Sequence, residues 1–393
     1  MHNFTFYAPT KVVFGRGTEA QAGALAKSYG AHKVLLHYGG KSALKSGLVD
    51  RVKASLTAAG LDFVELGGVV PNPLLSKVRE GIALCLREGV DFLLPVGGGS
   101  VIDSAKAIAC GIAEPDKDVW DLYQKKRIAK KCAPLGVVLT IAATGSEMSN
   151  SSVITNDQGE KRSYNDNIIR AKFAIMNPEL TMTLPDYQTE SGCSDIMLHT
   201  MERWFVNDGT SELTDGIATA LMLTVMKHAV ILHTDPTNYD SRAEVMWAGS
   251  LSHNDLTGCG GKTRGDWACH KLEHELSSMF GVTHGAGLAA IWGTWARYVH
   301  AECEHRFVKF ATDVMGVAPA ATDAETSLRG IEAMENFFRS IGMPTNLREL
   351  GVRPTEEQIL ELAAGCARGC GGKVGSAKVL TEEDMAQIYR LAK

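Results

Sequence analysis

The stretch DFLLPVGGGSVIDSAKAIACGI, from Asp91 to Ile112, decides the fold class. It opens with a short apolar run of the length of a buried strand, and this run leads directly into three glycines, Gly97 to Gly99. Small and apolar residues then recur at helical spacing, at Val101, Ile102, Ala105, Ile108 and Ala109. A strand, a glycine-rich turn and a helix in this order predict one βα unit of a parallel sheet.

Similar units surround this stretch. Short runs rich in β-branched residues predict further strands in HKVLLHY (32–38), DFVEL (62–66), LGVVLTI (135–141) and KFAIM (172–176). Amphipathic patterns over 48–60 and 76–89 predict helices between strands. Past TLPDYQTESG (183–192), strand-like runs stop and long helical patterns follow. The sequence therefore predicts a Rossmann-like α/β domain over residues 1–185 and an all-helical domain over 186–393.

Composition narrows the classes of partner. The chain has 393 residues, of which 45% are hydrophobic, and its formal net charge is -5 without a basic cluster. Neither nucleic acid nor a membrane is therefore an expected partner. The N-terminal stretch lacks an apolar signal core, and the apolar run over 216–232 contains Lys227 and His228, which favours a buried helix. We expect a cytoplasmic protein whose nine scattered cysteines are reduced.

The glycine-rich turn has two interpretations. Glycines let backbone N–H groups approach an anion, and the start of a helix adds partial positive charge, so Gly98, Gly99 and Ser100 could hold a pyrophosphate. The alternative is a tight turn without a ligand, because the spacing is not G-x-G-x-x-G. A second loop, TIAATGSEMSNSS, follows the next strand and offers the hydroxyls of Thr140 and Thr144. Two such loops at neighbouring strand ends favour a nucleotide.

Two polar pairs occur in the helical half. Asp195 and His199 are four residues apart in CSDIMLHTMERW, so they share one face of a helix. In GDWACHKLEHELSSMFGVTHGAG, His270 and His274 are also one turn apart, with Asp266 as expected N-cap and Gly281 as expected helix end. The zinc-protease motif H-E-x-x-H is absent from this stretch.

These pairs predict a metal site. One carboxylate and three imidazoles, from Asp195, His199, His270 and His284, suit Zn²⁺ or Fe²⁺ better than Mg²⁺ or Ca²⁺. His284 is expected in a glycine-flanked loop that folds back toward the helix. The alternative is that each histidine is an ordinary hydrogen-bonded core residue. Four residues at two compatible spacings favour the metal, which makes residues 186–393 a metal-binding catalytic domain.

At these residues the chain resembles the iron-containing alcohol dehydrogenase family, in particular its NADPH-dependent, butanol dehydrogenase-like branch. The resemblance covers nearly the whole chain and is carried by FYAPTKVVFGRG, PNP at 71–73, GGGSVIDSAK, AATGSE and DWACHKLEHELSSMFGVTHGAGLA. It implies a dinucleotide-binding α/β domain followed by a helical, metal-binding catalytic domain, as in dehydroquinate synthase-like folds.

The resemblance also implies residue roles. It assigns the metal to Asp195, His199, His270 and His284, and makes His274 a catalytic residue outside the ligand set. It assigns the nucleotide to Gly98, Gly99, Ser100, Asp103, Thr140 and Thr144, with Asn72 near the phosphates and Lys161 near the ribose. After GSEM, many relatives have asparagine where this chain has Ser149, with Asn150 one place later.

The implied activity is hydride transfer between NADP(H) and a primary alcohol or aldehyde such as butanol or butanal, with Fe²⁺ or Zn²⁺ polarising the substrate oxygen. NAD(H) is the alternative cofactor. Glycerol dehydrogenase-like polyol oxidation, a dehydroquinate synthase-like lyase and a non-enzymatic nucleotide or metal sensor are the alternative functions. Relatives are commonly dimers or larger, so we expect a homo-oligomer.

The preference for NADP(H) rests on LLHYGGKSALKSG (35–47). NAD-specific relatives carry an aspartate after this strand, which repels a 2′-phosphate, whereas this chain has Gly39 and Gly40. Gly39, Gly40 and Ser42 could donate hydrogen bonds to that phosphate, and Lys41 could add a positive charge. The alternative is a solvated loop.

Overall fold

The computed structural model describes residues 1–206, 208 and 210–393, and at Lys41 and Ser42 it describes the backbone alone. The chain forms two compact units. Residues 7–183 form an α/β unit, whereas residues 1–6 and 184–393 form a helical unit. The predicted fold class, a Rossmann-like α/β part followed by a helical part, is confirmed.

A parallel six-stranded sheet organises the α/β unit, with the strand order β1-β8-β5-β4-β2-β3. Its strands are β1 (Lys11–Phe14), β2 (Lys33–Tyr38), β3 (Asp62–Leu66), β4 (Phe92–Gly97), β5 (Gly136–Leu139) and β8 (Phe173–Met176). A separate antiparallel pair consists of β6 (Ser151–Thr155) and β7 (Lys161–Asn165). The five strands predicted from their apolar runs are thus present. Strand β1 lies in the FYAPTKVVFGRG stretch, and the β6–β7 pair is additional.

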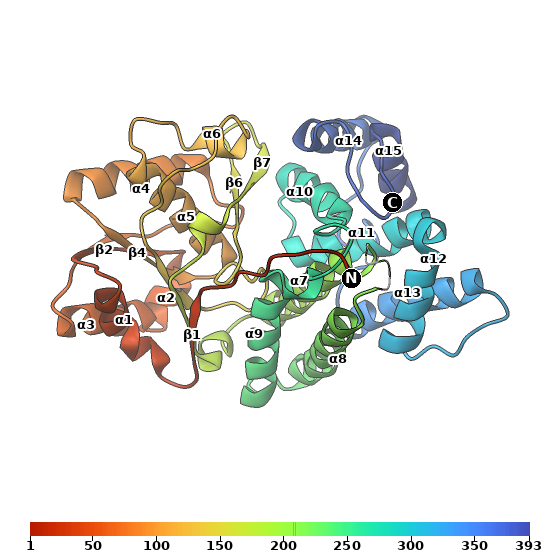
Figure 1. Cartoon of the computed structure of the whole chain (residues 1–393), viewed down its shortest axis with the longest axis horizontal. Coiled ribbons are helices and arrows are strands. Elements are labelled where there is room, and N and C mark those ends of the chain that lie inside the picture. The colour runs from red at the N-terminus through yellow and green to blue at the C-terminus, as the bar shows by residue number, and fades with distance from the viewer. Residues whose placement is uncertain (207, 209) are drawn as a thin grey trace. The chain divides into compact units, whose positions relative to one another are not determined.

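Helices cover both faces of the sheet (Figure 1). Their bounds are α1 (Ala22–Ser28), α2 (Lys41–Lys45), α3 (Leu48–Ala58), α4 (Leu75–Glu88), α5 (Gly99–Ala113) and α6 (Trp120–Tyr123). Alternate residues of a strand face opposite sides, so Leu36 and Leu94 pack against α1 and α3. On the other face His37, from the same strand as Leu36, contacts Ser104 of α5. Burial on both faces explains the nearly continuous apolar runs of these strands.

The helical unit contains α7 (Asp186–Trp204), α8 (Glu212–Thr234), α9 (Tyr239–His253), α10 (Ala268–Phe280), α11 (His284–Val299), α12 (Glu304–Lys309), α13 (Asp323–Ser340), α14 (Glu356–Cys370) and α15 (Glu382–Leu391) (Figure 1). Helix α7 is buried along almost its whole length after Thr189. Helix α11 approaches it closely, since a Cβ on Gly285 would lie 1.9 Å from the carbonyl oxygen of Ser191.

Helix α8 differs from the expectation of a buried helix. Only one of its faces is buried, and Leu213, Leu223 and Val230 on it are exposed. By length and composition, α8 is the one helix among the described residues that could cross a membrane, with about 33% of that stretch buried. Apolar core helices of proteins that do not enter membranes have the same length and composition.

Candidate functional site

Helix α7 carries Asp195 and His199 on one buried face. The side chains are 3% and 4% exposed, and His199 Nδ1 lies 3.3 Å from Asp195 Oδ1. Burial, followed by the charges of His253 and His270, holds the pKa of His199 well below its usual range. A neutral imidazole beside a buried carboxylate is the protonation state that a metal ligand needs.

The other two predicted ligands converge on the same carboxylate oxygen. His270 Nε2, from α10, lies 3.6 Å from Asp195 Oδ1, and His284 Nε2, from the first residue of α11, lies 3.7 Å from it. The structure therefore brings together the four side chains that the sequence predicts as ligands, all within the helical unit.

The geometry fits a small divalent ion. Ligand atoms about 2.0–2.2 Å from a tetrahedral Zn²⁺ lie roughly 3.3–3.6 Å from one another, close to the separations around Asp195 Oδ1. In addition, Asp195 Oδ1, His199 Nδ1 and His270 Nε2 are buried and have no hydrogen-bond partner in the described part of the chain. Partnerless buried polar atoms are rare in folded proteins, and a shared cation would satisfy all three.

Two glutamates orient the histidines, and the sequence reasoning missed both. Glu202 lies on α7, and its Oε1 accepts hydrogen bonds from the Nδ1 of His270, at 2.9 Å, and from the backbone N–H of His270, at 3.2 Å. Glu273 pairs with Nδ1 of His284. Because a carboxylate accepts at Nδ1 in both pairs, the proton sits there and Nε2, the atom that faces Asp195, is free to bind a cation.

Two carboxylates next to the ring determine the pKa of His270. Burial would lower the pKa of His270, but the carboxylates of Asp195 and Glu202 outweigh burial and raise it to about 9. Without a cation, the site therefore holds a proton on His270. A divalent cation would compete with this proton for Nε2.

His274 lies next to this cluster. It is buried, and its ring centroid is 5.8 Å from that of His284. Glu273, His274 and His284 form a second group close enough to hold an ion. The carboxylate of Glu273 already bonds to His284 and Ser277. The group of Asp195, His199 and His270, which has three buried atoms without a hydrogen-bond partner among the described residues, is therefore the better candidate for the metal site.

Two further aromatic residues line the cluster. The rings of His253, at the end of α9, and His199 meet edge to face with centroids 4.0 Å apart. Trp267 lies 5.4 Å from the His270 ring and has a positive φ of 65°, which is unusual for a residue with a side chain. A single sequence gives no spacing that links His253 to the other histidines.

Local details around α10 differ from expectation. The N-cap of α10 is Trp267 rather than Asp266, because Asp266 instead turns its carboxylate to the backbone N–H groups of Ala268, Ser376 and Ala377. Gly281 ends the helix as predicted, with φ 66°. His284 begins α11 rather than lying in the loop, which spans only 281–283.

In the α/β unit, the predicted nucleotide loops lie at one edge of the sheet. All strands of the sheet are parallel, so the turns after β2, β4 and β5 share an edge. Chain order reverses between β2 and β4, which are neighbours with β3 outside β2. Nucleotides bind beyond the strand ends at such a reversal. The turn after β2 carries Gly39 and Gly40. Gly98 follows β4, and Gly99 and Ser100 are the first residues of α5.

The glycine turn packs directly against the next loop. A Cβ on Gly99 would lie 2.5 Å from Thr144 Oγ1, and one on Gly98 would lie 3.0 Å from Ile141. Thr140, in the same loop, donates its backbone N–H to Gly97. A side chain at position 99 would therefore collide with Thr144, and one at position 98 would be tightly packed against Ile141.

The remaining cofactor predictions lie in the same unit. Gly39 is next to Val69 and Val101, and the side chains of Lys41 and Ser42 lie outside the described residues. Asn72 has a φ of 55°, and Lys161 is buried in β7. The carboxylate of Asp103 accepts from Ser146 Oγ at 2.6 Å and Val153 N at 2.9 Å, so it has a structural task in the fold.

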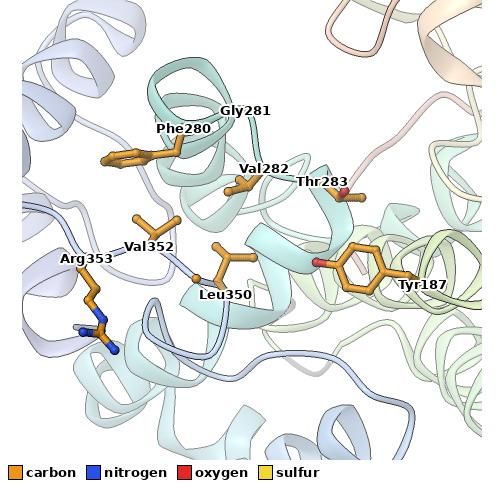
Figure 2. Close-up of a pocket in the computed structure, with 9 residues that line it drawn as sticks. Tyr187, Phe280, Gly281, Val282, Thr283, Leu350, Val352 and Arg353 are labelled. Carbon is orange, nitrogen blue, oxygen red and sulfur yellow. The ribbon is translucent and has the colours of Figure 1, made fainter.

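A pocket of about 400 Å³ opens in the helical unit beside the end of α10 (Figure 2). It lies between the residues that end α10 and start the next loop, 280–283, and residues 350–353, with Tyr187 from α7 at its edge. No predicted ligand lines it, although Thr283 precedes His284. The pocket is therefore distinct from the candidate metal centre.

The nucleotide-type parallel sheet defines the class of dinucleotide-binding α/β proteins, and the buried carboxylate–histidine cluster is suited to a metal ion. Comparison with protein families gives the particular family. The model described as iron-containing alcohol dehydrogenase matches residues 9–178, and that described as Fe-containing alcohol dehydrogenase family, C-terminal, matches residues 189–393. The chain belongs to the iron-containing alcohol dehydrogenase family, and it is an alcohol dehydrogenase or aldehyde reductase of the NAD(P)H-dependent kind.

Individual relatives agree. The chain is 37% identical to NADH-dependent butanol dehydrogenase A of Clostridium acetobutylicum, covering 99% of each chain. It is 35% identical to NADPH-dependent aldehyde reductase YqhD of Escherichia coli, covering 90% of each. Among solved structures, NADH-dependent butanol dehydrogenase A of Thermotoga maritima is similar with a TM-score of 0.95 and 38% identity, covering 100% of this chain and 99% of that one. The polyol and lyase alternatives are not favoured.

Proposed function

We propose that this enzyme interconverts short primary alcohols and aldehydes, such as butanol and butanal, with NADP(H) preferred over NAD(H). The observation that carries the proposal is a cluster of three buried ligand atoms without hydrogen-bond partners among the described residues, in which His199 Nδ1 and His270 Nε2 both face Asp195 Oδ1, in a chain of this family. The substrate class is supported by relatives named for butanol and for aldehydes.

We assign the metal to Asp195, His199, His270 and His284, and a bound Fe²⁺ or Zn²⁺ would supply Lewis-acid polarisation of the substrate oxygen. The family name favours iron. A nitrogen-rich site binds Zn²⁺ at least as tightly as Fe²⁺ by the usual divalent series, so isolated protein can contain either. Glu202 and Glu273 hold His270 and His284 with Nε2 toward Asp195.

We assign His274 the transfer or orientation of a proton near the substrate. It is buried beside His284, and it does not belong to the group of ligand atoms around Asp195. Residues 1–185 would bind the dinucleotide, and residues 186–393 would hold the metal and the catalytic residues. The cofactor would occupy the turns after β2, β4 and β5.

The NADP(H) preference is supported by the absence of a carboxylate at Gly39 and Gly40. The names of relatives point both ways, since the Clostridium relative is NADH-dependent and the Escherichia relative is NADPH-dependent. We also propose that the enzyme is a cytoplasmic homodimer or larger homo-oligomer, which light scattering at micromolar concentration would test. A monomer would contradict the proposed homo-oligomer.

The test is a matched set of steady-state assays. Protein loaded with Fe²⁺ without oxygen, or with Zn²⁺, is assayed with NADPH and NADH against butanal, and with NADP⁺ and NAD⁺ against butanol and glycerol. We expect kcat/KM with butanal to be about tenfold or more higher with NADPH than with NADH. Faster oxidation of glycerol than of butanol would favour a polyol dehydrogenase, and equal or better efficiency with NADH would contradict the cofactor preference.

A further inference from the structure

Lys106, on α5, is completely buried in the α/β unit. Its ammonium donates to Ser151 O at 2.7 Å, to Ser149 O at 3.0 Å and to Ser146 Oγ at 3.1 Å. An ammonium has three N–H donors, so these bonds use all of them. A buried charge is costly unless it is fully hydrogen-bonded, so this arrangement holds the backbone of residues 146–151 in place.

Asp103, one turn before Lys106 on the same helix, completes the attachment. Its carboxylate accepts from Ser146 Oγ at 2.6 Å and from the backbone of Val153 at 2.9 Å. The Ser146 hydroxyl thus links Asp103 and Lys106, because it donates to the first and accepts from the second. Arg170 holds the same segment from another side through the carbonyl of Met148.

This segment continues the loop that carries Thr140 and Thr144. Gly145 separates the two parts and has a φ of 60°, so the chain turns sharply there. Thr144 packs against Gly99 closely enough that a Cβ on Gly99 would lie 2.5 Å from its hydroxyl. The position of Ser146 therefore determines how Thr144 lies against the glycine turn.

We propose that Lys106 is a positioning residue that holds the 140–151 loop against the glycine turn and thereby sets the affinity for the dinucleotide. This inference rests on the proposed cofactor site. Ser149 takes part through its backbone carbonyl, at 3.0 Å, and its hydroxyl oxygen lies 3.4 Å from the ammonium.

Electrostatics supports this role. Burial lowers the pKa of Lys106 to about 8. The negative charges of Asp103 and Glu147 oppose this decrease, and the positive charge of Arg170 adds a smaller decrease. Cys132 also faces it. Neutral Lys106 keeps two N–H donors, so one of the three bonds to the loop is lost as pH rises through 8.

The test measures dinucleotide binding by metal-free protein through the fluorescence of NADPH and NADH, at pH 7 and pH 9. Lys106→Met preserves length but removes all three donors, and Lys172→Met at an exposed position of the same unit is the matched control. We expect Lys106→Met to raise Kd about tenfold or more, whereas Lys172→Met should bind both nucleotides like wild type. The wild-type Kd should rise about tenfold from pH 7 to pH 9, and that of Lys106→Met should not.

An unchanged Kd in folded Lys106→Met overturns the inference. If Lys106→Met does not fold, Ser146→Ala and the wild-type pH series decide, since Ser146→Ala removes the link between Asp103 and Lys106. An unchanged Kd in Ser146→Ala together with a wild-type Kd that is flat from pH 7 to pH 9 overturns it equally. Wild-type protein that binds neither nucleotide refutes the proposed cofactor site itself, and the inference with it.

Discussion

Glu202 is the residue that fixes the proton on His270. One carboxylate oxygen receives both the ring and backbone N–H of His270, and the other receives the backbone N–H of Trp267 at 2.5 Å. Glutamine has only one acceptor oxygen, so Glu202→Gln must lose part of this arrangement. We expect Glu202→Gln to weaken metal binding about 10–100-fold, measured by equilibrium dialysis against buffered Zn²⁺ with elemental analysis.

The control is Glu357→Gln, which makes the same charge change at an exposed position of α14. It should bind metal like wild type. Equal metal affinity in Glu202→Gln and Glu357→Gln would mean that His270 needs no orienting carboxylate.

His37 gives a prediction about pH. It is completely buried in β2, with Nδ1 donating to Leu66 O and Nε2 accepting from Ser104 Oγ. Burial lowers its pKa to about 4, whereas an unfolded chain has a value of about 6.5. Below pH 6.5 the unfolded state therefore binds the proton first, and stability falls as pH falls until about 4.

We expect the α/β unit to lose roughly 2 kcal/mol between pH 7 and pH 5 through His37. Hydrogen exchange of β2 amides, corrected for intrinsic rates, measures this loss. His37→Gln keeps a neutral polar side chain and should show a smaller loss over the same range. The same loss in both proteins would place the titrating group elsewhere.

At the scale of residues, spacing in the sequence predicts some members of the candidate metal site and not others. Asp195 and His199 are predictable because a helix itself brings positions four apart onto one face. Glu202 is not, because its partner His270 is 68 residues away and only the packing of α7 against α10 brings them together. His253 is missed for the same reason, since nothing in the chain near it indicates His199.

At the scale of elements, we propose that the turn after β2 governs the choice between NADP(H) and NAD(H). Gly39 has ordinary backbone angles, and a Cβ there would lie 3.5 Å from Val69 O and 3.6 Å from Val101, which is normal contact. A Cβ at position 39 is therefore accommodated without moving its neighbours. The carboxylate of an aspartate there would repel a 2′-phosphate and accept from a ribose 2′-hydroxyl.

We expect Gly39→Asp to shift the ratio of kcat/KM for NADPH over NADH toward NADH by about tenfold or more. Gly39→Asn, which has nearly the same shape without the charge, is the matched control and should shift the ratio much less. An unchanged ratio in Gly39→Asp would show that the 2′-phosphate does not approach this turn.

The elements themselves were predictable where their patterns are regular. The inner strands β2, β4, β5 and β8 are buried on both faces, so their apolar runs are nearly continuous, as in FLLPV before Gly97. The β6–β7 pair escaped because its sequences, SSVIT and KRSYN, are polar and give no alternation. Helix α10 begins after Trp267 because the Asp266 carboxylate is drawn to Ser376 and Ala377, which are distant in sequence.

At the scale of the molecule, the predicted ligands and the predicted nucleotide loops belong to different units. We expect His270→Ala and His284→Ala to lose bound metal and turnover but to bind NADPH within about twofold of wild type, since nucleotide loops of this type act through their own strand ends. Elemental analysis and NADPH fluorescence on the same samples measure both. Full activity and metal content in both variants would refute the site.

His274→Ala is the comparison variant for this experiment. Its side chain lies beside the cluster rather than at Asp195, so the variant should keep its metal while losing rate or changing its pH profile. Loss of metal in His274→Ala with retention in His270→Ala would reverse the assignment of these two histidines.

The contact of Gly285 with Ser191 has a consequence for how this protein can evolve. Any side chain at position 285 would collide with the backbone of α7, whatever its chemistry, because the obstacle is a carbonyl that cannot rotate away. The neighbour of His284 is thus as intolerant of change as a ligand, although it donates no electron pair. A lineage that changes its metal or substrate can replace side chains around the cluster singly, each at its own cost. It cannot vary the distance between α7 and α11 without rebuilding both helices together.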